Sequence, residues 1–300
     1  KMADMQPLRL CCLNPHCRLV VALWVGTLLY AKVGYSQISE AQAPQPTPQV
    51  VPADRSEDCA EALAMARNRD SGVNGLTSPF SLLNWNVEKA QHPELITAFA
   101  KFAKGSDLIF LQEAVPLKKN QTVIEQSLFE AFARGYVQNE IETGVLTLAR
   151  VPHLVHCHMT AIEPWLRTPK ATSVTLYPLR NSKHALLTVN LHAVNFSFGI
   201  EAYSAQLDAV AALIRLHPGP VIFGGDLNTW SERRLHVVEQ LAAELQLTPV
   251  PFSPDHRTTT FGNPLDHIYV RGLTWQSTEA RPVSTSDHNP LFATFRWTDP

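Results

Sequence analysis

The sequence predicts an α/β fold in which mixed β-sheets are covered by helices, and two observations support this prediction. Short apolar runs rich in β-forming residues recur at 80–84, 108–111, 145–148, 173–177, 185–191, 221–224, 268–270 and 291–297. Segments with helical periodicity occur at 57–69, 93–102, 122–132, 200–216 and 232–245. Strands and helices alternate early in the chain and strands predominate later, which favours mixed sheets with helices outside.

Individual segments support these assignments. The runs Leu-Ile-Phe-Leu at 108–111 and Val-Ile-Phe at 221–223 are continuously apolar, as expected of buried strands. In the segment 200–216, Val210, Leu213 and Ile214 share one helical face, whereas Glu201 and Asp208 point away from it. The sequence contains no internal repeat, so solenoid architectures are excluded.

Composition limits the classes of function. The chain has 300 residues, enough for one large domain or two small ones. Its 45% hydrophobic and 17% charged residues are typical of a globular protein. The formal net charge is −2, without the basic excess that is usual in proteins that bind duplex DNA. A nuclease is therefore disfavoured but not excluded, since a local basic patch can exist in a neutral total.

The amino-terminal third is expected to lie outside the catalytic fold. Residues 19–31 (LVVALWVGTLLYA) carry no charge, but the run is shorter than the ~20 residues that span a bilayer. A cleaved signal peptide, an uncleaved anchor and a buried apolar helix all remain open. The protein is therefore expected to be cytoplasmic, or else exported or membrane-anchored through this segment. Residues 42–52 are rich in proline and predict an extended linker. The expected division is 1–35, 36–78 with a short helix, and a catalytic domain at 79–300.

The five cysteines do not predict a disulfide framework. Cys11, Cys12 and Cys17 precede the apolar run, whereas Cys59 and Cys157 are far apart in the chain. An odd number with this distribution argues against structural disulfides. The first three, together with a nearby histidine, match no familiar zinc spacing.

Polar residues end or border several of the expected strands. These groups are Asn84-Trp85-Asn86, Gln112-Glu113, His192 with Asn195, Gly225-Asp226-Leu227-Asn228, and Ser286-Asp287-His288-Asn289. A polar residue at the carboxyl end of a strand leaves the core and enters the crevice where α/β sheets hold ligands. Carboxylates and histidines that converge there would suit a hard divalent cation beside a proton-transfer pair. This chemistry fits the cleavage of a phosphate ester.

In this order, the groups resemble the motifs of the endonuclease/exonuclease/phosphatase (DNase I-like) superfamily, whose members include DNase I-like nucleases and sphingomyelinase-like enzymes. The resemblance extends from about residue 81 to 296. The stretches 169–171, 191–197 (LHAVNFS) and 286–291 (SDHNPL) are similar to the YafD-like bacterial group. The resemblance implies a four-layer sandwich of two mixed β-sheets flanked by helices, with the active site at the rim of the sandwich.

The resemblance also implies a role for each site residue. Glu113, Asn86 and Asp287 would hold Mg²⁺, or Mn²⁺ in its place, and Asn84 is a weaker candidate. Asp226 would orient or deprotonate the attacking water, and Asp266 would orient His288. His192 is the candidate acid for the leaving oxygen. The substrate phosphate would be held by four residues, which are His192, Asn195, Asn228 and His288.

The resulting hypothesis is metal-dependent hydrolysis of a phosphodiester by in-line attack of water. Nucleic acid is the first expected substrate class, and lipid or small-molecule phosphates are the second. A scaffold that retains the fold without activity is the third alternative, which the intact set of acids disfavours. Lys170, Arg167, Arg257 and Arg271 are expected to be solvated surface charges, and Phe196 and Phe198 are expected to pack rather than to stack on bases. The protein is expected to be a monomer, with residues 19–31 as a candidate membrane contact.

Overall fold

The computed structural model describes residues 49–51, 56–66, 74–116, 128–138, 140–197 and 199–297. All of these residues belong to one compact unit, which extends from Pro46 to the end of the chain. The apolar run at 19–31 and the first three cysteines lie outside the described residues, so the expectations about them stay predictions. No helix in the described ranges is both long enough and apolar enough to cross a membrane.

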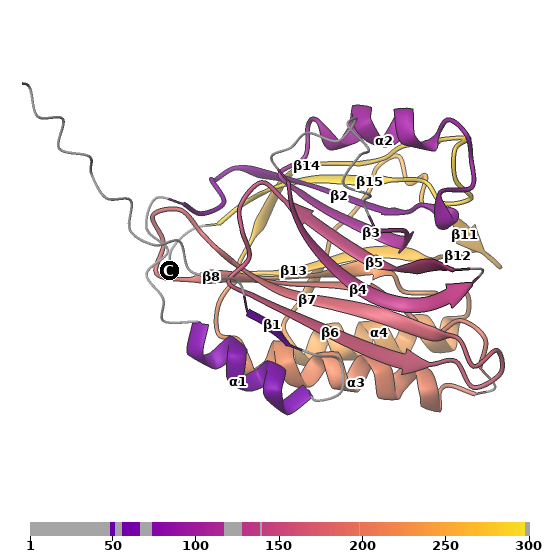
Figure 1. Ribbon diagram of the computed structural model, residues 1–300, viewed down its shortest axis with the longest axis horizontal. Helices are drawn as coiled ribbons and strands as arrows, with labels where there is room; N and C mark the ends of the chain where they lie inside the picture. Colours follow the sequence, from indigo (N-terminus) through magenta and orange to yellow (C-terminus); the bar gives the residue numbers. More distant parts are fainter. Residues whose placement is uncertain are drawn as a thin grey trace, which may run out of the picture. The chain divides into compact units, whose positions relative to one another are not determined.

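Two large β-sheets form the centre of the fold (Figure 1). The seven-stranded sheet has the order β1 (Gln49–Val51), β6 (Val155–Ile162), β7 (Pro169–Pro178), β8 (Ala185–His192), β9 (Val221–Asp226), β13 (Asp266–Arg271) and β10 (Thr248–Pro249). The six-stranded sheet has the order β14 (Thr274–Ala280), β15 (Leu291–Arg296), β2 (Phe80–Asn86), β3 (Leu108–Ala114), β5 (Ile141–Ala149) and β4 (Phe129–Gln138). A separate hairpin consists of β11 (Thr259–Thr260) and β12 (Asn263–Pro264). Both large sheets are mixed, since β8–β9 and β2–β3 are parallel pairs among antiparallel ones.

Helices cover the outer faces of the two sheets. Helix α2 (Leu95–Ala103) lies over the six-stranded sheet, and the short 3₁₀ helix η1 (Glu88–Ala90) follows β2. Helices α1 (Ser56–Ala66), α3 (Glu201–Leu216) and α4 (Glu232–Glu244) lie over the seven-stranded sheet (Figure 1). The predicted four-layer sandwich of two mixed sheets between helices is therefore confirmed.

The alternation of side chains along the strands explains this layering. On β2 and β3, Leu82 and Phe110 point into the core between the sheets, which also contains Ile222 of the opposite sheet. Their chain neighbours Leu83 and Leu111 point the other way and pack under α2. Because a β-strand has a period of two, each of these apolar runs supplies residues to two separate cores.

A buried polar network ties the two sheets together near the rim. The Gln112 side-chain amide donates to Asn84 Oδ1 at 3.0 Å and to Asn190 Oδ1 at 2.7 Å, which joins β3 to β2 and to β8 in the other sheet. Asn190 donates in turn to the Thr147 hydroxyl at 3.2 Å. Asn84 is fully buried in this network and orients Gln112, whose bond to Asn190 links the two sheets.

Two secondary-structure expectations were wrong. Residues 129–132, expected at the end of a helix, begin strand β4, whereas 122–127 lie outside the described residues. Ala131 and Ala133 are buried at alternate positions, so this segment follows a strand period in the fold. Strands β6 and β14 were not expected, because their polar residues hide the apolar pattern.

The expectation of no structural disulfide was also wrong. Cys59 of α1 is bonded to Cys157 of β6, with 5.8 Å between the Cα atoms. The end of the proline-rich stretch forms β1, which pairs in parallel with β6. The two cysteines are 98 residues apart in the chain, so only the fold shows that they are neighbours.

Candidate active site

Three of the predicted site residues lie in a row across adjacent strands. In the sheet register, His192 at the end of β8 pairs with Asp226 at the end of β9. Asp226 pairs in turn with Asp266 at the start of β13. The His192 Nε2 atom lies 3.5 Å from the nearer Asp226 carboxylate oxygen. The carboxyl ends of two parallel strands and the start of an antiparallel strand therefore meet at one edge. The sequence predicted the convergence of the strand ends but not the part of β13.

Gly225 allows this close approach. Its φ is +134°, a conformation that side chains rarely adopt. A Cβ atom there would lie 2.0 Å from the carbonyl oxygen of Leu191. Only glycine therefore fits between β8 and Asp226.

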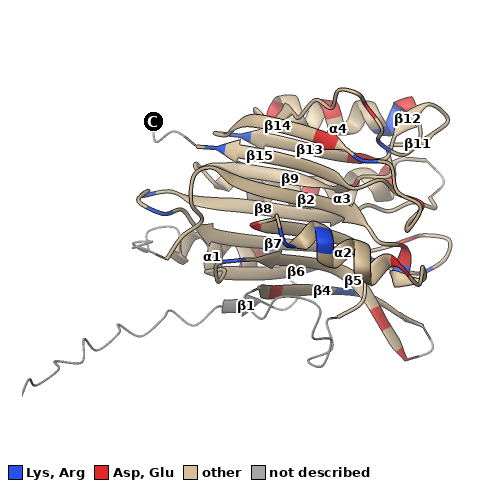
Figure 2. Ribbon diagram, turned by 90° about the horizontal axis from the view of Figure 1, so that it is seen from above, with Lys and Arg blue, Asp and Glu red and all other residues tan. Residues whose placement is uncertain are grey.

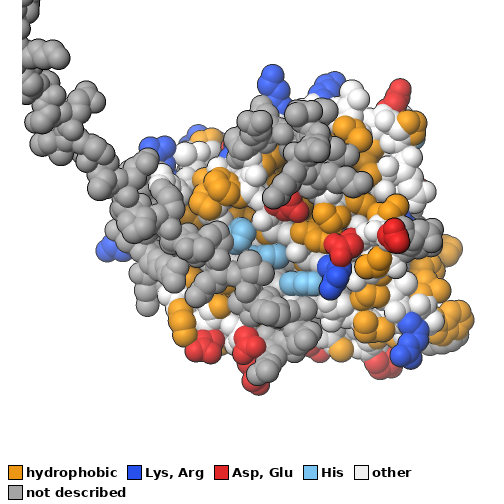
Figure 3. Space-filling view, in the orientation of Figure 1, with side chains coloured by type: hydrophobic (Ala, Val, Ile, Leu, Met, Phe, Trp, Pro, Cys, Tyr) orange, Lys and Arg blue, Asp and Glu red, His pale blue; other side chains and the backbone are white. Residues whose placement is uncertain are grey.

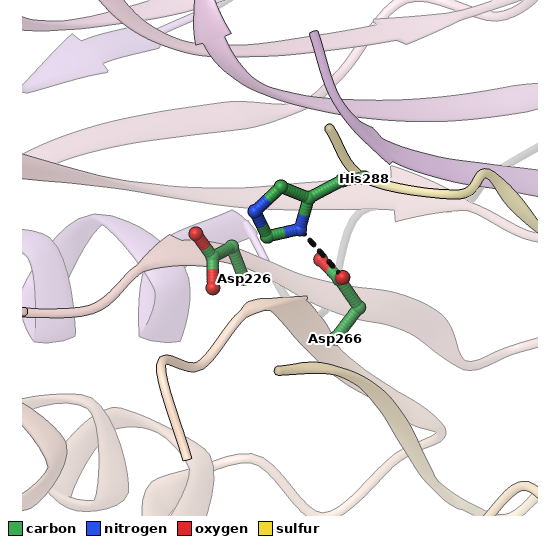
Figure 4. Close-up of side chains that lie close together, drawn as sticks. All are labelled: Asp226, Asp266 and His288. Carbon is green, nitrogen blue, oxygen red and sulfur yellow. Dashed lines mark hydrogen bonds and ion pairs between the residues drawn. The ribbon is translucent and has the colours of Figure 1, made fainter. Parts of the chain in front are cut away.

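His288 reaches this row from the loop before β15. Its Nδ1 lies 2.7 Å from Asp266 Oδ2, and its other ring nitrogen is on the side of Asp226 (Figure 4). Its backbone carbonyl accepts a 2.8 Å hydrogen bond from the Trp85 indole, which fixes the loop against β2. Burial alone would lower the pKa of His288, but the charges of Asp266 and Asp226 outweigh it and raise the pKa to about 10. The imidazole is thus held as a cation between two carboxyl groups.

Asp226 is buried and held by several donors. Asn86 donates through its side-chain amide to Oδ2 at 3.0 Å, and the backbone N–H of Asn228 donates to Oδ1 at 3.1 Å. The Asn228 amide itself donates to the carbonyl of Ala193 at 3.0 Å. Burial raises the pKa of Asp226 to about 6, against the opposing charge of His288. A carboxyl group with this pKa can exchange protons near neutral pH.

Glu113 lies on the other side of His192. One of its carboxylate oxygens is 3.8 Å from His192 Nε2, and the other forms a 2.8 Å ion pair with Lys89. Glu113 has a φ of +51°, which is uncommon for a residue with a side chain and typical of functional sites. In the register of β2 and β3, Asn86 pairs with Gln112, so Asn86 and Glu113 lie at the same end of neighbouring strands.

Lys170 belongs to the site, although the sequence favoured a solvated surface charge. Its Nζ donates to His192 Nε2 at 2.9 Å and lies 3.8 Å from Glu163. Burial, together with the charges of Lys170 and His288, lowers the pKa of His192 well below its usual value. His192 is therefore a neutral acceptor here, and the ammonium group of Lys170 is the nearest proton donor.

Three further buried residues were missed, and they support the loop after His192. Glu163 accepts from the backbone N–H of Asn195 at 2.8 Å. Gln206 of α3 accepts from the N–H of Val194 at 2.8 Å. Arg234 of α4 donates to carbonyl oxygens of that loop. Gln206 and Arg234 are polar residues on the otherwise apolar, buried faces of their helices. A polar residue at such a position was the feature of the sequence that could have identified them.

The donor set fits a hard divalent cation. Asp226, Asp266 and His288 have side-chain atoms that all lie within 4.8 Å of one another. The two carboxylates offer oxygen ligands, whereas His288 in its protonated form cannot bind a cation. Asp266 Oδ1 is buried and has no hydrogen-bond partner among the described residues. Glu113, whose carboxylate is partly exposed and paired with an ammonium group, offers a second oxygen position nearby. Such oxygen-rich clusters suit Mg²⁺ or Mn²⁺.

The structure thus brings together most of the predicted site residues, which are Asn86, Glu113, His192, Asp226, Asn228, Asp266 and His288. Asp287 is exposed at the rim, where its carboxylate accepts only a long 3.4 Å bond from Ser286 among the described contacts. The amide oxygen of Asn195 accepts from the Trp230 indole at 3.0 Å, which orients this side chain. Phe196, expected to pack, is 54% exposed, and Phe198 lies outside the described residues.

Comparisons with known proteins agree with this fold. The model of the Endonuclease/Exonuclease/phosphatase family matches residues 83–288. A UPF0294 protein of Vibrio cholerae is 36% identical over 275 residues, which cover 91% of this chain and 97% of that protein. Two solved structures share the fold at low identity. The human Nocturnin catalytic domain has a TM-score of 0.55 and 16% identity and covers 75% of this chain and 96% of its own. A mannosyl-6-phosphatase of Bacteroides thetaiotaomicron has a TM-score of 0.56 and 14% identity and covers 73% and 100%. The chain therefore belongs to the endonuclease/exonuclease/phosphatase family.

Proposed function

We propose that this protein is a divalent-cation-dependent phosphoesterase that hydrolyses phosphodiester bonds by direct attack of water. The observation that carries the proposal is the His288 imidazole between Asp226 and Asp266, beside His192 and Lys170. Family membership supports the same class of reaction. Two carboxylates, two imidazoles and an ammonium group at one edge can position water, move its proton and hold phosphate charge.

In this proposal, Asp226 takes the proton of the attacking water, because its pKa of about 6 leaves it ionised at neutral pH. Asp266 holds the His288 imidazolium, which would bind a phosphoryl oxygen. Asn228 would bind a second oxygen, and Lys170 would supply the proton for the leaving oxygen next to His192. The oxygen of water forms the new P–O bond, and the P–O bond to one alcohol breaks.

Glu113 and Asn86 would hold the cation, with Asp287 from the loop beside them. The Ser286 hydroxyl donates to the backbone carbonyl of Asn86 at 2.7 Å, which places that loop next to β2. The alternative cluster of Asp226, Asp266 and His288 is less suitable, because its carboxylates already hold an imidazolium. When bound, the cation would neutralise phosphate charge and stabilise the leaving oxygen.

The metal requirement is tested with a substrate panel. The parent protein is expected to hydrolyse bis-p-nitrophenyl phosphate with Mg²⁺ and to lose this activity in EDTA. Glu113→Gln is expected to lower the rate by roughly 100-fold or more and to raise the Mg²⁺ concentration for half-maximal activity, since it removes a ligand charge. Glu239→Gln, an exposed acid on α4, is the matched control. Full activity in EDTA would overturn the cation-dependent proposal.

The charge distribution bears on the choice of substrate. Lys and Arg are interspersed with Asp and Glu along the described elements (Figure 2), and the whole chain has 25 Lys and Arg against 27 Asp and Glu. Proteins that bind nucleic-acid strands through several phosphates usually have a basic excess. Lipid or small-molecule phosphodiesters therefore fit better than long nucleic acids. The same panel should include single-stranded DNA, whose hydrolysis at a higher rate than the other diesters would reverse this order.

We further propose that the domain folds in an oxidising compartment outside the cytoplasm. The Cys59–Cys157 disulfide supports this, because structural disulfides persist mainly in such compartments. In protein isolated from its native cells under acid quenching, Cys59 and Cys157 are expected to react with a thiol reagent only after reduction. Free reactivity of both thiols without a reductant would contradict the proposed location.

A further inference from the structure

A pocket of about 420 Å³ opens beside the active site and shares residues with it. Asn195 and Asn228 line the side next to the phosphate-binding groups. The remaining wall is largely aromatic and contains Trp165, Trp230 and Phe261. None of the residues that line the pocket is charged. A group bound there would adjoin the scissile phosphate, and a second anionic group would find no counter-charge in this lining.

The mouth of this pocket is apolar and projects into solvent. We call Trp165, Leu166, Phe196 and Phe261 the apolar rim. Their exposed fractions are 61%, 57%, 54% and 87%, respectively. They come from three separate loops, which are the β6–β7 loop, the loop after β8 and the β11–β12 hairpin. Hydrophobic atoms gather along the right-hand edge in Figure 3, where Figure 1 places β11 and β12. Clustered exposed apolar side chains around a binding pocket indicate contact with an apolar partner.

The charges near the rim do not suit a polyanion. Lys170 is engaged with His192 and Glu163, and Arg257 forms a 2.7 Å ion pair with Asp255. The described residues thus offer one phosphate site next to an uncharged aromatic surface. This combination fits a molecule with a single phosphodiester between apolar and small polar groups. Trp and Phe side chains on projecting loops are also typical of protein surfaces that enter the interface of a bilayer.

We infer that the apolar rim docks the protein on a lipid bilayer and that the substrate is a phospholipid whose phosphodiester enters the active site from the membrane. The inference rests on the proposed function and names its substrate class. In the reaction, water adds its oxygen to phosphorus, one P–O–C link breaks at the P–O bond, and the leaving alkoxide is protonated. The products are an alcohol and a phosphomonoester. Because the rim and the pocket lining lack charge, binding should not require anionic lipid.

Flotation of the full chain with phosphatidylcholine vesicles tests the docking step, since it does not depend on catalysis. Parent protein is expected to float with the vesicles, and raising salt from about 0.1 M to about 0.5 M should change the bound fraction little. Phe261→Ala and Trp165→Ala are each expected to weaken vesicle binding about tenfold or more, because each removes a large apolar side chain from the interface. Phe129→Ala and Trp275→Ala are matched controls, since these residues are 44% and 37% exposed on β4 and β14. The controls should bind like the parent.

Hydrolysis assays separate this inference from the proposed function. Leu166 belongs to the rim but does not line the pocket, so Leu166→Ala should also weaken vesicle binding without touching the bound substrate. With Mg²⁺, this variant should hydrolyse a small soluble diester, methyl p-nitrophenyl phosphate, within about twofold of the parent, while its hydrolysis of phosphatidylcholine vesicles falls with binding. If the parent hydrolyses the soluble diester but does not bind vesicles, or if the rim variants bind like the controls, the inference fails and the proposed function stands. If the rim governs vesicle binding but no diester is hydrolysed, the proposed function fails. Oligonucleotide binding that Phe261→Ala abolishes would replace the lipid by a nucleic acid and overturn the inference.

Discussion

Asp226→Asn is expected to lower kcat for a soluble phosphodiester by about 10²–10⁴-fold, because it removes the group that takes the proton of water. The change keeps the volume of the side chain, and its amide oxygen can still accept from the Asn228 N–H. Its amide nitrogen would face the Asn86 amide, which now donates to Asp226 Oδ2. We therefore expect the variant to remain folded at the assay temperature, so that unfolding does not account for the loss of kcat. Thermal unfolding of the same samples checks this.

The pH dependence of the parent tests the same role. Burial raises the pKa of Asp226 to about 6, so the ionised form decreases as the pH falls below that value. The rate is expected to fall about tenfold per pH unit below pH 6. The residual rate of Asp226→Asn should lack this dependence. Asp208→Asn, an exposed acid on α3, is the control and should retain both rate and pH profile. A parent-like rate in Asp226→Asn would remove Asp226 from the proton-transfer role.

The sequence predicted that His192 and Asp226 lie at one edge because each follows an apolar run, whereas Asp266 was expected there only through the family resemblance. Such runs become buried strands, and the edge of a sheet gathers their polar ends. The Asn84 amide shows the limit of this reasoning. Asn84 and Asn86 lie two residues apart on β2, yet Asn84 accepts from the buried Gln112 and Asn86 donates to Asp226. Asn86 is the last residue of β2 and reaches the site, whereas Asn84 lies two residues further inside the sandwich. The sequence does not show where the opposite sheet ends, so it could not assign these two roles.

The missed residues depend on contacts that chain position does not reveal. Lys170 lies at the start of β7, and Glu163 precedes the turn that leads into that strand. Only the antiparallel pairing of β7 with β8 brings Lys170 to His192. The Cys59–Cys157 bond was missed for the same reason, since packing of α1 against β6 creates that proximity. Short-range patterns thus identify strands and their polar ends, whereas the pairing order of the sheet determines which of these ends meet.

Arg234→Met is expected to destabilise the protein and to impair catalysis without removing any group that contacts substrate. The guanidinium is 1% exposed and donates to the carbonyl oxygens of Val194 and Asn195, both at 2.7 Å, and to that of Asn228 at 3.1 Å. Its carbon centre also lies 4.5 Å from the centroid of the Tyr203 ring. Methionine would fill much of the volume but leave these buried acceptors unpaired. Unfolding free energy should fall by about 3 kcal/mol or more, and Tm by about 6–12 °C.

The loss of activity in Arg234→Met should appear in kcat, because the carbonyl groups released belong to the segments that carry Asn195 and Asn228. Arg233→Met is the matched control, since Arg233 is the exposed neighbour on the same helix. Arg234→Lys keeps the charge, but a single ammonium group cannot reach carbonyl groups on both sides as the planar guanidinium does, so its stability should lie between parent and methionine variant. If Arg234→Met and Arg233→Met had the same Tm, the segments that carry Asn195 and Asn228 would be held by their other contacts. A stable Arg234→Met with lowered kcat would instead assign Arg234 to positioning alone.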